Sequence, residues 1–249
     1  MLISFFEEYP GNKILSNLNL IDFSTKIYLG DYSIEGFKQY KRELKNYKNI
    51  KEFIWWPIIN VNEGYWLSPW SKRKALLRTF HNLLNENIPI LWDAELPRNR
   101  LLLFTQSFKF FKNKFLINSF MKRYKGKIYT AEYAFSNKIS NKIFEFFGLF
   151  FSPEKYNTIQ IKMMYTSMHP ISENYMESKI KEGLEKYKDR FLVGLGVIAT
   201  GIRGNEKLIS LKNLERDLNI CKKLGVSEVV IYRLGGLSKD YLRIIKKFV

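Results

Sequence analysis

Apolar and polar positions alternate along this chain in a regular rhythm. Short apolar runs, rich in β-branched and aromatic residues, recur about every 30 residues, and stretches with helical periodicity separate them. Runs of this kind predict strands, and the periodic stretches predict amphipathic helices. The predicted strands are residues 2–10, 26–31, 52–59, 88–97, 127–135, 159–170, 191–201 and 227–236.

The alternation of strands and helices predicts the fold class. Such alternation implies parallel strands joined by helical crossovers, and eight units in 249 residues match the size of a (β/α)8 barrel. Serines at five positions can cap the predicted helices: Ser33, Ser71, Ser172, Ser210 and Ser238. No linker or low-complexity tract divides the chain. We therefore expect an α/β protein with a single (β/α)8 TIM barrel domain over residues 1–249.

Composition adds constraints on partners and location. The net charge is +17, but lysines are scattered over every predicted helix, which argues against a clustered nucleic-acid footprint. The single cysteine suits a reducing cytosol. The first residues have acids at positions 7 and 8 and no basic leader, and no apolar stretch reaches the length of a membrane span. A cytoplasmic protein is expected, with association to an anionic membrane surface left open.

The stretch IPILWDAELP, residues 88–97, places two carboxyl groups at the end of the fourth strand. Side chains alternate along a strand, so Asp93 and Glu95 should point to the same side and shift each other's pKa. Active sites of such barrels lie at the C-terminal strand ends. Polar groups at or beyond the other strand ends are Glu7, Glu8, Asp31, Glu132, Tyr165, His169, Arg203 and Arg233. Only one of the adjacent residues Glu7 and Glu8 can face inward on a regular strand.

A parallel barrel whose fourth strand ends in Asp93-Ala94-Glu95 resembles the glycoside hydrolase barrels of the chitinase-like and lysozyme-like type. The resemblance covers the strand layout and this motif. The chitinase-type motif has further aspartates upstream, where this chain has Leu91 and Trp92. The resemblance implies a glutamate general acid, Glu95, and an orienting aspartate, Asp93. Glycoside hydrolysis needs a second stabilising group, for which Glu132 and Glu8 are the candidates.

Tryptophans support a saccharide ligand. Four of the five lie in residues 55–73, in and after the third strand, and the fifth is Trp92 beside the acids. Indoles offer flat apolar faces with a polar group, which suit sugar rings, although they can equally plug the barrel mouth or pack under a helix. The expected substrate contacts are Glu7, Asp31, Trp55, Trp56, Glu63, Trp66, Trp92, Tyr165, His169 and Arg233.

Glycine-rich loops after the last two strands favour an alternative function. Barrels often hold a phosphate there, so a lyase, isomerase or transferase acting on a phosphorylated sugar is the second hypothesis. The residues concerned are Gly201, Arg203, Gly204, Gly235 and Gly236. A non-catalytic barrel is the third, expected if the acids are paired with Arg203 or Arg233 and the pocket is filled.

No cofactor is predicted from motifs. The chain has no HExxH pattern and no paired cysteines, which argues against structural zinc, while a divalent ion on carboxylates with His169 stays open.

Two phenylalanine-rich stretches, residues 104–126 and 141–153, indicate a further contact surface. In the first, phenylalanines at positions 108, 110, 111 and 115 occupy more than one helix face, and lysines lie between them. A surplus of exposed aromatic surface indicates an anionic membrane surface or a homo-oligomer.

Overall fold

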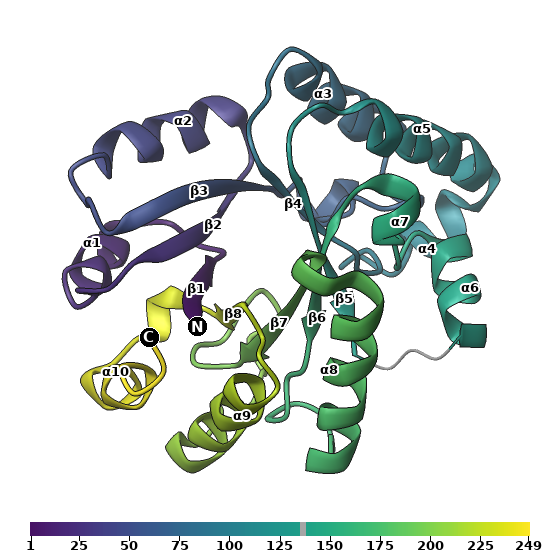
Figure 1. Cartoon of the computed structure of the whole chain (residues 1–249). Helices are drawn as coiled ribbons and strands as arrows, with labels where there is room; N and C mark the ends of the chain where they lie inside the picture. Colours follow the sequence, from purple (N-terminus) through teal and green to yellow (C-terminus); the bar gives the residue numbers. More distant parts are fainter. Residues whose placement is uncertain (135–137) are drawn as a thin grey trace.

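The computed structural model describes residues 1–134 and 138–249. Eight parallel strands close into a barrel in chain order, with β1 paired to both β2 and β8, and helices surround it (Figure 1). The fold class predicted from the sequence is therefore confirmed. The strands are β1 (Leu2–Glu7), β2 (Thr25–Asp31), β3 (Ile50–Pro57), β4 (Ile90–Asp93), β5 (Ile128–Tyr133), β6 (Ile159–Met163), β7 (Phe191–Gly196) and β8 (Glu228–Tyr232).

Helices follow the strands and cover the outside of the barrel. The α-helices are α1 (Asn12–Leu18), α2 (Ile34–Glu43), α3 (Arg73–Leu84), α4 (Leu102–Thr105), α5 (Phe110–Arg123), α6 (Lys138–Phe147), α7 (Pro153–Tyr156), α8 (Glu173–Tyr187), α9 (Leu211–Lys223) and α10 (Lys239–Ile245). The short 3-10 helices are η1 (Val61–Glu63), η2 (Ser107–Lys109), η3 (Lys188–Arg190) and η4 (Leu234–Gly236).

Serine caps set several of these helix starts. The side chains of Ser33, Ser172, Ser210 and Ser238 each accept a hydrogen bond from a backbone N–H three residues further on, as predicted. The prediction for Ser71 is wrong. Its hydroxyl donates to the Trp66 carbonyl at 2.9 Å within the loop after β3, and α3 begins at Arg73, after Lys72, without a side-chain cap.

The strands separate two apolar cores. One side chain in two points into the barrel, where the interior is packed by residues such as Tyr28, Ile54, Leu91 and Val230. The others point outward and pack against the helices, which form the larger core. Because both faces of every strand are buried, the strands read in the sequence as almost continuous apolar runs.

Helix α5 carries aromatic side chains on two sides. Phe110 and Phe120 are buried, while Phe111 and Phe115 are 67% and 76% exposed. In the second phenylalanine-rich stretch, Phe150 and Phe151 are buried, while Ile143 and Phe146 are 50% and 44% exposed. Among the residues that the structure describes, no helix combines the length and the apolar character needed to cross a bilayer.

Candidate functional site

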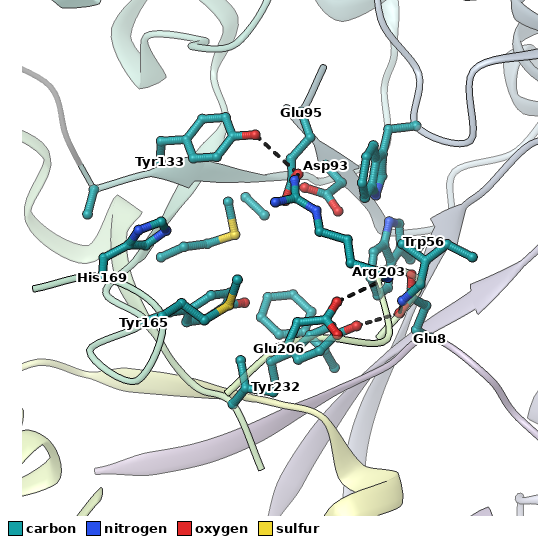
Figure 2. Close-up of a pocket in the computed structure, with 18 residues that line it drawn as sticks. Glu8, Trp56, Asp93, Glu95, Tyr133, Tyr165, His169, Arg203, Glu206 and Tyr232 are labelled. Atoms are coloured by element: carbon teal, nitrogen blue, oxygen red, sulfur yellow. Dashed lines mark hydrogen bonds and ion pairs between the residues drawn. The ribbon is translucent and has the colours of Figure 1, made fainter. Parts of the chain in front are cut away.

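A pocket opens at the C-terminal ends of the strands, where the sequence predicted it (Figure 2). Its space, including the part open to solvent, is about 770 Å³. Residues from or just beyond every strand except β2 line it: Phe6, Glu8, Trp56, Trp66, Asp93, Glu95, Ala131, Tyr133, Ala134, Met163, Tyr165, Met168, His169, Val197, Ile202, Arg203, Glu206 and Tyr232.

Asp93 ends β4 and is 9% exposed. Burial, reinforced by the nearby charges of Glu95 and Glu8, holds the pKa of Asp93 well above its usual range, although Arg203 and the Trp66 indole act in the opposite direction. In the described part of the chain, Asp93 Oδ1 is buried and has no hydrogen-bond partner. The carboxyl group is therefore suited to be protonated and to donate a hydrogen bond.

Glu95 lies two residues beyond Asp93, and Figure 2 shows the two carboxyl groups next to each other at the pocket wall. Glu95 Oε2 accepts hydrogen bonds from Arg203 Nη2 at 2.7 Å and from the Tyr133 hydroxyl at 3.1 Å. Burial raises the pKa of Glu95 even though the guanidinium of Arg203 and the Tyr133 hydrogen bond lower it. The predicted convergence of the two acids is thus observed, together with an arginine that pairs with one of them.

Glu8 is the inward-facing member of the pair at the end of β1. Its carboxylate accepts hydrogen bonds from the Tyr65 hydroxyl at 2.5 Å, from the Ile202 N–H at 3.2 Å and from the Tyr232 hydroxyl. Burial raises the pKa of Glu8, and these donors oppose that effect. Glu8 therefore ties the loops after β3 and β7 to the end of β8.

Arg203 crosses the pocket from the loop after β7. Its guanidinium lies 5.8 Å from the centre of the Trp66 ring and pairs with Glu95. Its backbone N–H donates to Glu206 Oε1 at 3.1 Å, while Glu206 Oε2 is buried with no hydrogen-bond partner among the described residues. The lining thus contains four carboxyl groups and one arginine.

Tyr165 and His169 line the pocket, as predicted for residues after β6. Burial, together with the charges of Asp93 and Glu95, holds the pKa of Tyr165 well above its usual range. Burial and the nearby Arg203 lower the pKa of His169, which favours a neutral imidazole.

Two of the predicted tryptophans line the pocket and two do not. Trp56 and Trp66 face it. Trp55 points outward, donates to the Asp31 carbonyl at 3.1 Å and stacks on a phenylalanine of α2. Trp92 packs outside the barrel against Phe80, Phe120 and Phe151. The expectation of substrate contacts from Trp55 and Trp92 is corrected, because each neighbours an inward-facing residue on its strand.

Glu132 does not belong to the pocket either. It lies behind β5, where it accepts hydrogen bonds from the Phe151 N–H at 2.9 Å, Thr130 Oγ1 at 2.9 Å and Gln160 Nε2 at 2.6 Å. The Lys162 ammonium lies 3.9 Å away. Its proposed role as a supporting carboxylate is corrected by the strand alternation, which turns Tyr133 inward instead.

Glu7 and Arg233 form an ion pair at 2.8 Å outside the pocket lining. Glu7 Oε1 also accepts from the Tyr9 N–H, and Glu7 Oε2 accepts from the Gly235 N–H at 2.5 Å. The same arginine donates to the Thr200 carbonyl. These groups, expected to bind substrate or phosphate, contact one another.

The remaining glycines of the proposed phosphate loops are closely packed or turn-forming. A Cβ at Gly201 would lie 2.7 Å from Glu8 Oε2, and one at Gly236 would lie 2.0 Å from the Ile198 carbonyl oxygen. Gly204 has φ +72°, a left-handed conformation that favours glycine. Since Glu7 and Glu8 occupy N–H groups of both loops, the geometry does not favour a phosphate between them.

Asp31 and Glu63 also lie away from the pocket. Asp31 accepts from the Ser33 N–H at 2.9 Å at the start of α2, and Glu63 pairs with Arg78 at 2.8 Å on the surface. Among residues 1–134 and 138–249, no group of three or more histidine, cysteine, aspartate or glutamate side chains is arranged to hold a metal ion. His169, Asp93 and Glu132 are therefore not brought together as ligands.

Ten lining residues were not predicted, and three of them bring polar groups to the pocket: Tyr133, Glu206 and Tyr232. Tyr133 and Tyr232 end their strands, and strand alternation could have identified Tyr133 once Glu132 was assigned to the outer face. Glu206 lies in a loop, where no periodicity indicates orientation.

Comparisons with solved structures support the fold. The chain is similar to the glycoside hydrolase domain of PgaB (BpsB) from Bordetella bronchiseptica, with a TM-score of 0.56 and 12% identity over 97% of this chain and 94% of that chain. It is similar to a chitinase from Chromobacterium violaceum, with a TM-score of 0.55 and 10% identity over 99% and 98%. For the spore cortex-lytic enzyme SleL from Bacillus megaterium, the TM-score is 0.53 and the identity 10%, over 99% and 73%.

At such low identity these likenesses concern the fold. No protein-family model matches the sequence, and no curated protein matches it. The chain has a glycoside-hydrolase-like (β/α)8 fold.

Proposed function

We propose that this protein acts on a saccharide as a glycoside-hydrolase-like enzyme. The observation that carries the proposal is the pair Asp93 and Glu95, two neighbouring carboxyl groups with raised pKa values in one enclosed pocket. Most glycoside hydrolases use two carboxyl groups near the scissile bond, and barrel active sites lie at the C-terminal strand ends.

The pocket wall suits a neutral sugar. The indole side chains of Trp56 and Trp66 line the pocket and can pack against a sugar ring. Trp56 Nε1, Trp66 Nε1, Asp93 Oδ1 and Glu206 Oε2 are buried and lack hydrogen-bond partners within the described residues, so two indole donors and two carboxyl oxygens can pair with hydroxyl or amide groups. The excess of carboxyl groups over Arg203 disfavours a phosphorylated ligand.

In the proposed reaction, Glu95 is the general acid. A carboxylic acid kept protonated by burial can donate its proton to the leaving glycosidic oxygen as the C–O bond breaks, and the resulting carboxylate can accept a proton from the water that then bonds to the anomeric carbon. Arg203 holds Glu95 Oε2 in the ligand-free protein, so the substrate must displace this guanidinium before the proton is transferred. Asp93 lies beside Glu95 and orients the substrate or its amide, and Glu8 supports the pocket wall through Tyr65 and Tyr232.

Ligand titration followed by tryptophan fluorescence tests this function. Wild type, Glu95→Gln and Asp93→Asn are titrated with neutral oligosaccharides, including chitin oligosaccharides because a similar structure is a chitinase, and with sugar phosphates. We expect binding of a neutral sugar by all three proteins and a loss of turnover of about 10²–10⁴-fold in Glu95→Gln. Glu63→Gln, outside the pocket, is the matched control and should keep full turnover. Binding of phosphorylated ligands alone, unaffected by either variant, would contradict the proposal.

A non-catalytic saccharide-binding barrel is the second candidate. The ion pair between Arg203 and Glu95 favours it, because a paired carboxylate is a poor proton donor. The two candidates differ in turnover. Tight sugar binding with no product from wild type, and binding that Glu95→Gln leaves unchanged, would select the second.

A further inference from the structure

Four phenylalanines form an exposed line along α4, η2 and α5, away from the pocket lining. Phe104, Phe108, Phe111 and Phe115 are 78%, 74%, 67% and 76% exposed, and Leu101 precedes them at 68%. Phe111 and Phe115 are four residues apart on α5 and therefore lie on one side of that helix, while Phe104 on α4 and Phe108 on η2 precede them. We call Leu101, Phe104, Phe108, Phe111 and Phe115 the phenylalanine stripe.

The stripe is not the core-facing side of these helices. That side is formed by other residues of α5, namely Phe110, Ile117, Phe120 and Met121, all buried. Packing against the barrel therefore leaves the phenylalanine stripe unexplained. Exposed aromatic surface of this extent, gathered on one line, is unusual on a monomer and marks a contact surface.

The segment that carries the stripe is strongly basic. Residues 96–131 contain no aspartate or glutamate and nine basic side chains: Arg98, Arg100, Lys109, Lys112, Lys114, Lys122, Arg123, Lys125 and Lys127. Lys109 lies 5.3 Å from the centre of the Phe108 ring, and Lys114 lies 4.2 Å from that of Phe146 on α6. Lys122 continues the line of Phe115 two turns further along α5. An occupant that is both apolar and anionic matches this surface.

We propose that the phenylalanine stripe docks the protein peripherally on an anionic phospholipid bilayer. Large aromatic side chains enter the boundary between headgroups and acyl chains, and lysines and arginines contact anionic headgroups. A second copy of this chain fits less well, because it would bring the same excess of positive charge to the interface. Docking is independent of the proposed saccharide chemistry, since no stripe residue lines the pocket.

Vesicle co-sedimentation tests the proposal. The full-length protein is mixed with vesicles of phosphatidylcholine alone or of phosphatidylcholine with phosphatidylglycerol, at low and at physiological salt. We expect binding to the anionic vesicles, weakened by salt, and little binding to the neutral ones. The variant F104S/F108S/F111S/F115S should bind at least about tenfold more weakly. Because these side chains are exposed, its thermal unfolding and its saccharide binding should match those of wild type.

Two further variants separate the contributions. Lys112→Glu with Lys122→Glu keeps every phenylalanine but should lose the preference for anionic vesicles. Lys45→Glu with Lys48→Glu, an equal change of charge on exposed lysines between α2 and β3, should bind as wild type does. Tyr32→Ser with Leu84→Ser removes exposed apolar side chains elsewhere and should have no effect.

Three results would overturn the proposal. They are absence of vesicle binding by wild type, equal binding by the four-fold serine variant, and equal losses in the two lysine variants. Analytical ultracentrifugation examines the alternative occupant. A dimer that the serine variant abolishes, in a protein that does not bind vesicles, would assign the stripe to self-association.

Discussion

Asp93 combines a position in the pocket wall with an energetic cost to the fold. Burial and the charges of Glu95 and Glu8 hold its pKa well above the usual range. The folded state therefore binds a proton more tightly than the unfolded state does. The stability contributed by this group is complete below the unfolded pKa of about 3.9 and is lost as pH rises through the higher folded pKa.

The variant Asp93→Asn should remove this pH dependence. We expect wild type and variant to be equally stable near pH 4, and the variant to be more stable by about 1 kcal/mol at pH 7–8, where it no longer carries a buried charge. Urea unfolding at several pH values measures the difference. Asp189→Asn, at an exposed aspartate, is the control. A stability difference that does not change with pH would contradict the assignment.

Glu132 shows the opposite case, a buried acid that serves the fold. Its carboxylate accepts from the Phe151 N–H, Thr130 and Gln160, near Lys162. Glu132→Ala should lower the free energy of unfolding by about 3 kcal/mol, because it leaves these donors and the ammonium without their acceptor. Glu132→Gln should lose less free energy of unfolding. Saccharide binding by the folded variants should be unchanged. A variant that is fully folded but binds the saccharide more weakly would show that Glu132 contributes to the site.

At the scale of elements, position was predictable and orientation was not. All eight strands lie within or next to the predicted ranges, because buried parallel strands give apolar runs separated by helical periodicity. The same burial on both faces hides which residue of an adjacent pair points inward. Trp55 and Trp56 have almost the same local sequence pattern, yet only Trp56 reaches the pocket. Asp93 and Glu95 were predictable as a pair because their spacing of two does not depend on that choice.

Packing between α8 and β7 gives a prediction at this scale. A Cβ at Gly183 would lie 2.2 Å from the ring of Phe191. Alanine is intrinsically favoured in a helix by about 1 kcal/mol, but here the overlap should dominate and Gly183→Ala should destabilise the protein by about 1–3 kcal/mol.

Urea unfolding of two comparison proteins checks the cause. Ser178→Ala, at an exposed position of the same helix, should be neutral or slightly stabilising. Shortening the opposing side chain, in Gly183→Ala with Phe191→Leu, should recover part of the loss. A destabilisation that Phe191→Leu leaves unrelieved would show that the ring is not its origin.

At the scale of the whole molecule, the large net positive charge dominates the electrostatics. With a net charge of +17, the positive side chains repel one another and destabilise the folded state. Many of the ion pairs are on the surface, where each contributes little to stability. Raising the NaCl concentration from 10 to 150 mM should screen the repulsion and raise Tm by about 2–4 °C.

Thermal unfolding followed by circular dichroism measures this shift. The variant Lys45→Gln with Lys48→Gln, which carries less positive charge, should show a smaller salt effect. A Tm that falls with salt would mean that attractive pairs outweigh the repulsion.

The net charge could be read directly from the sequence. The pairing of Arg203 with Glu95 could not, because the two residues are far apart in the chain and meet only when the barrel closes.

The corner formed by Glu7, Arg233 and Gly235 has a consequence for how such barrels change function. The Arg233 guanidinium and the Gly235 N–H together form an anion-binding site, and the Glu7 carboxylate at the end of β1 occupies it. Glu7→Ala should empty this anion-binding site, and sulfate should then raise the Tm of the variant more than it raises that of wild type at equal ionic strength. If it does, a single substitution separates a barrel closed by its own carboxylate from one that recruits an oxyanion from solution.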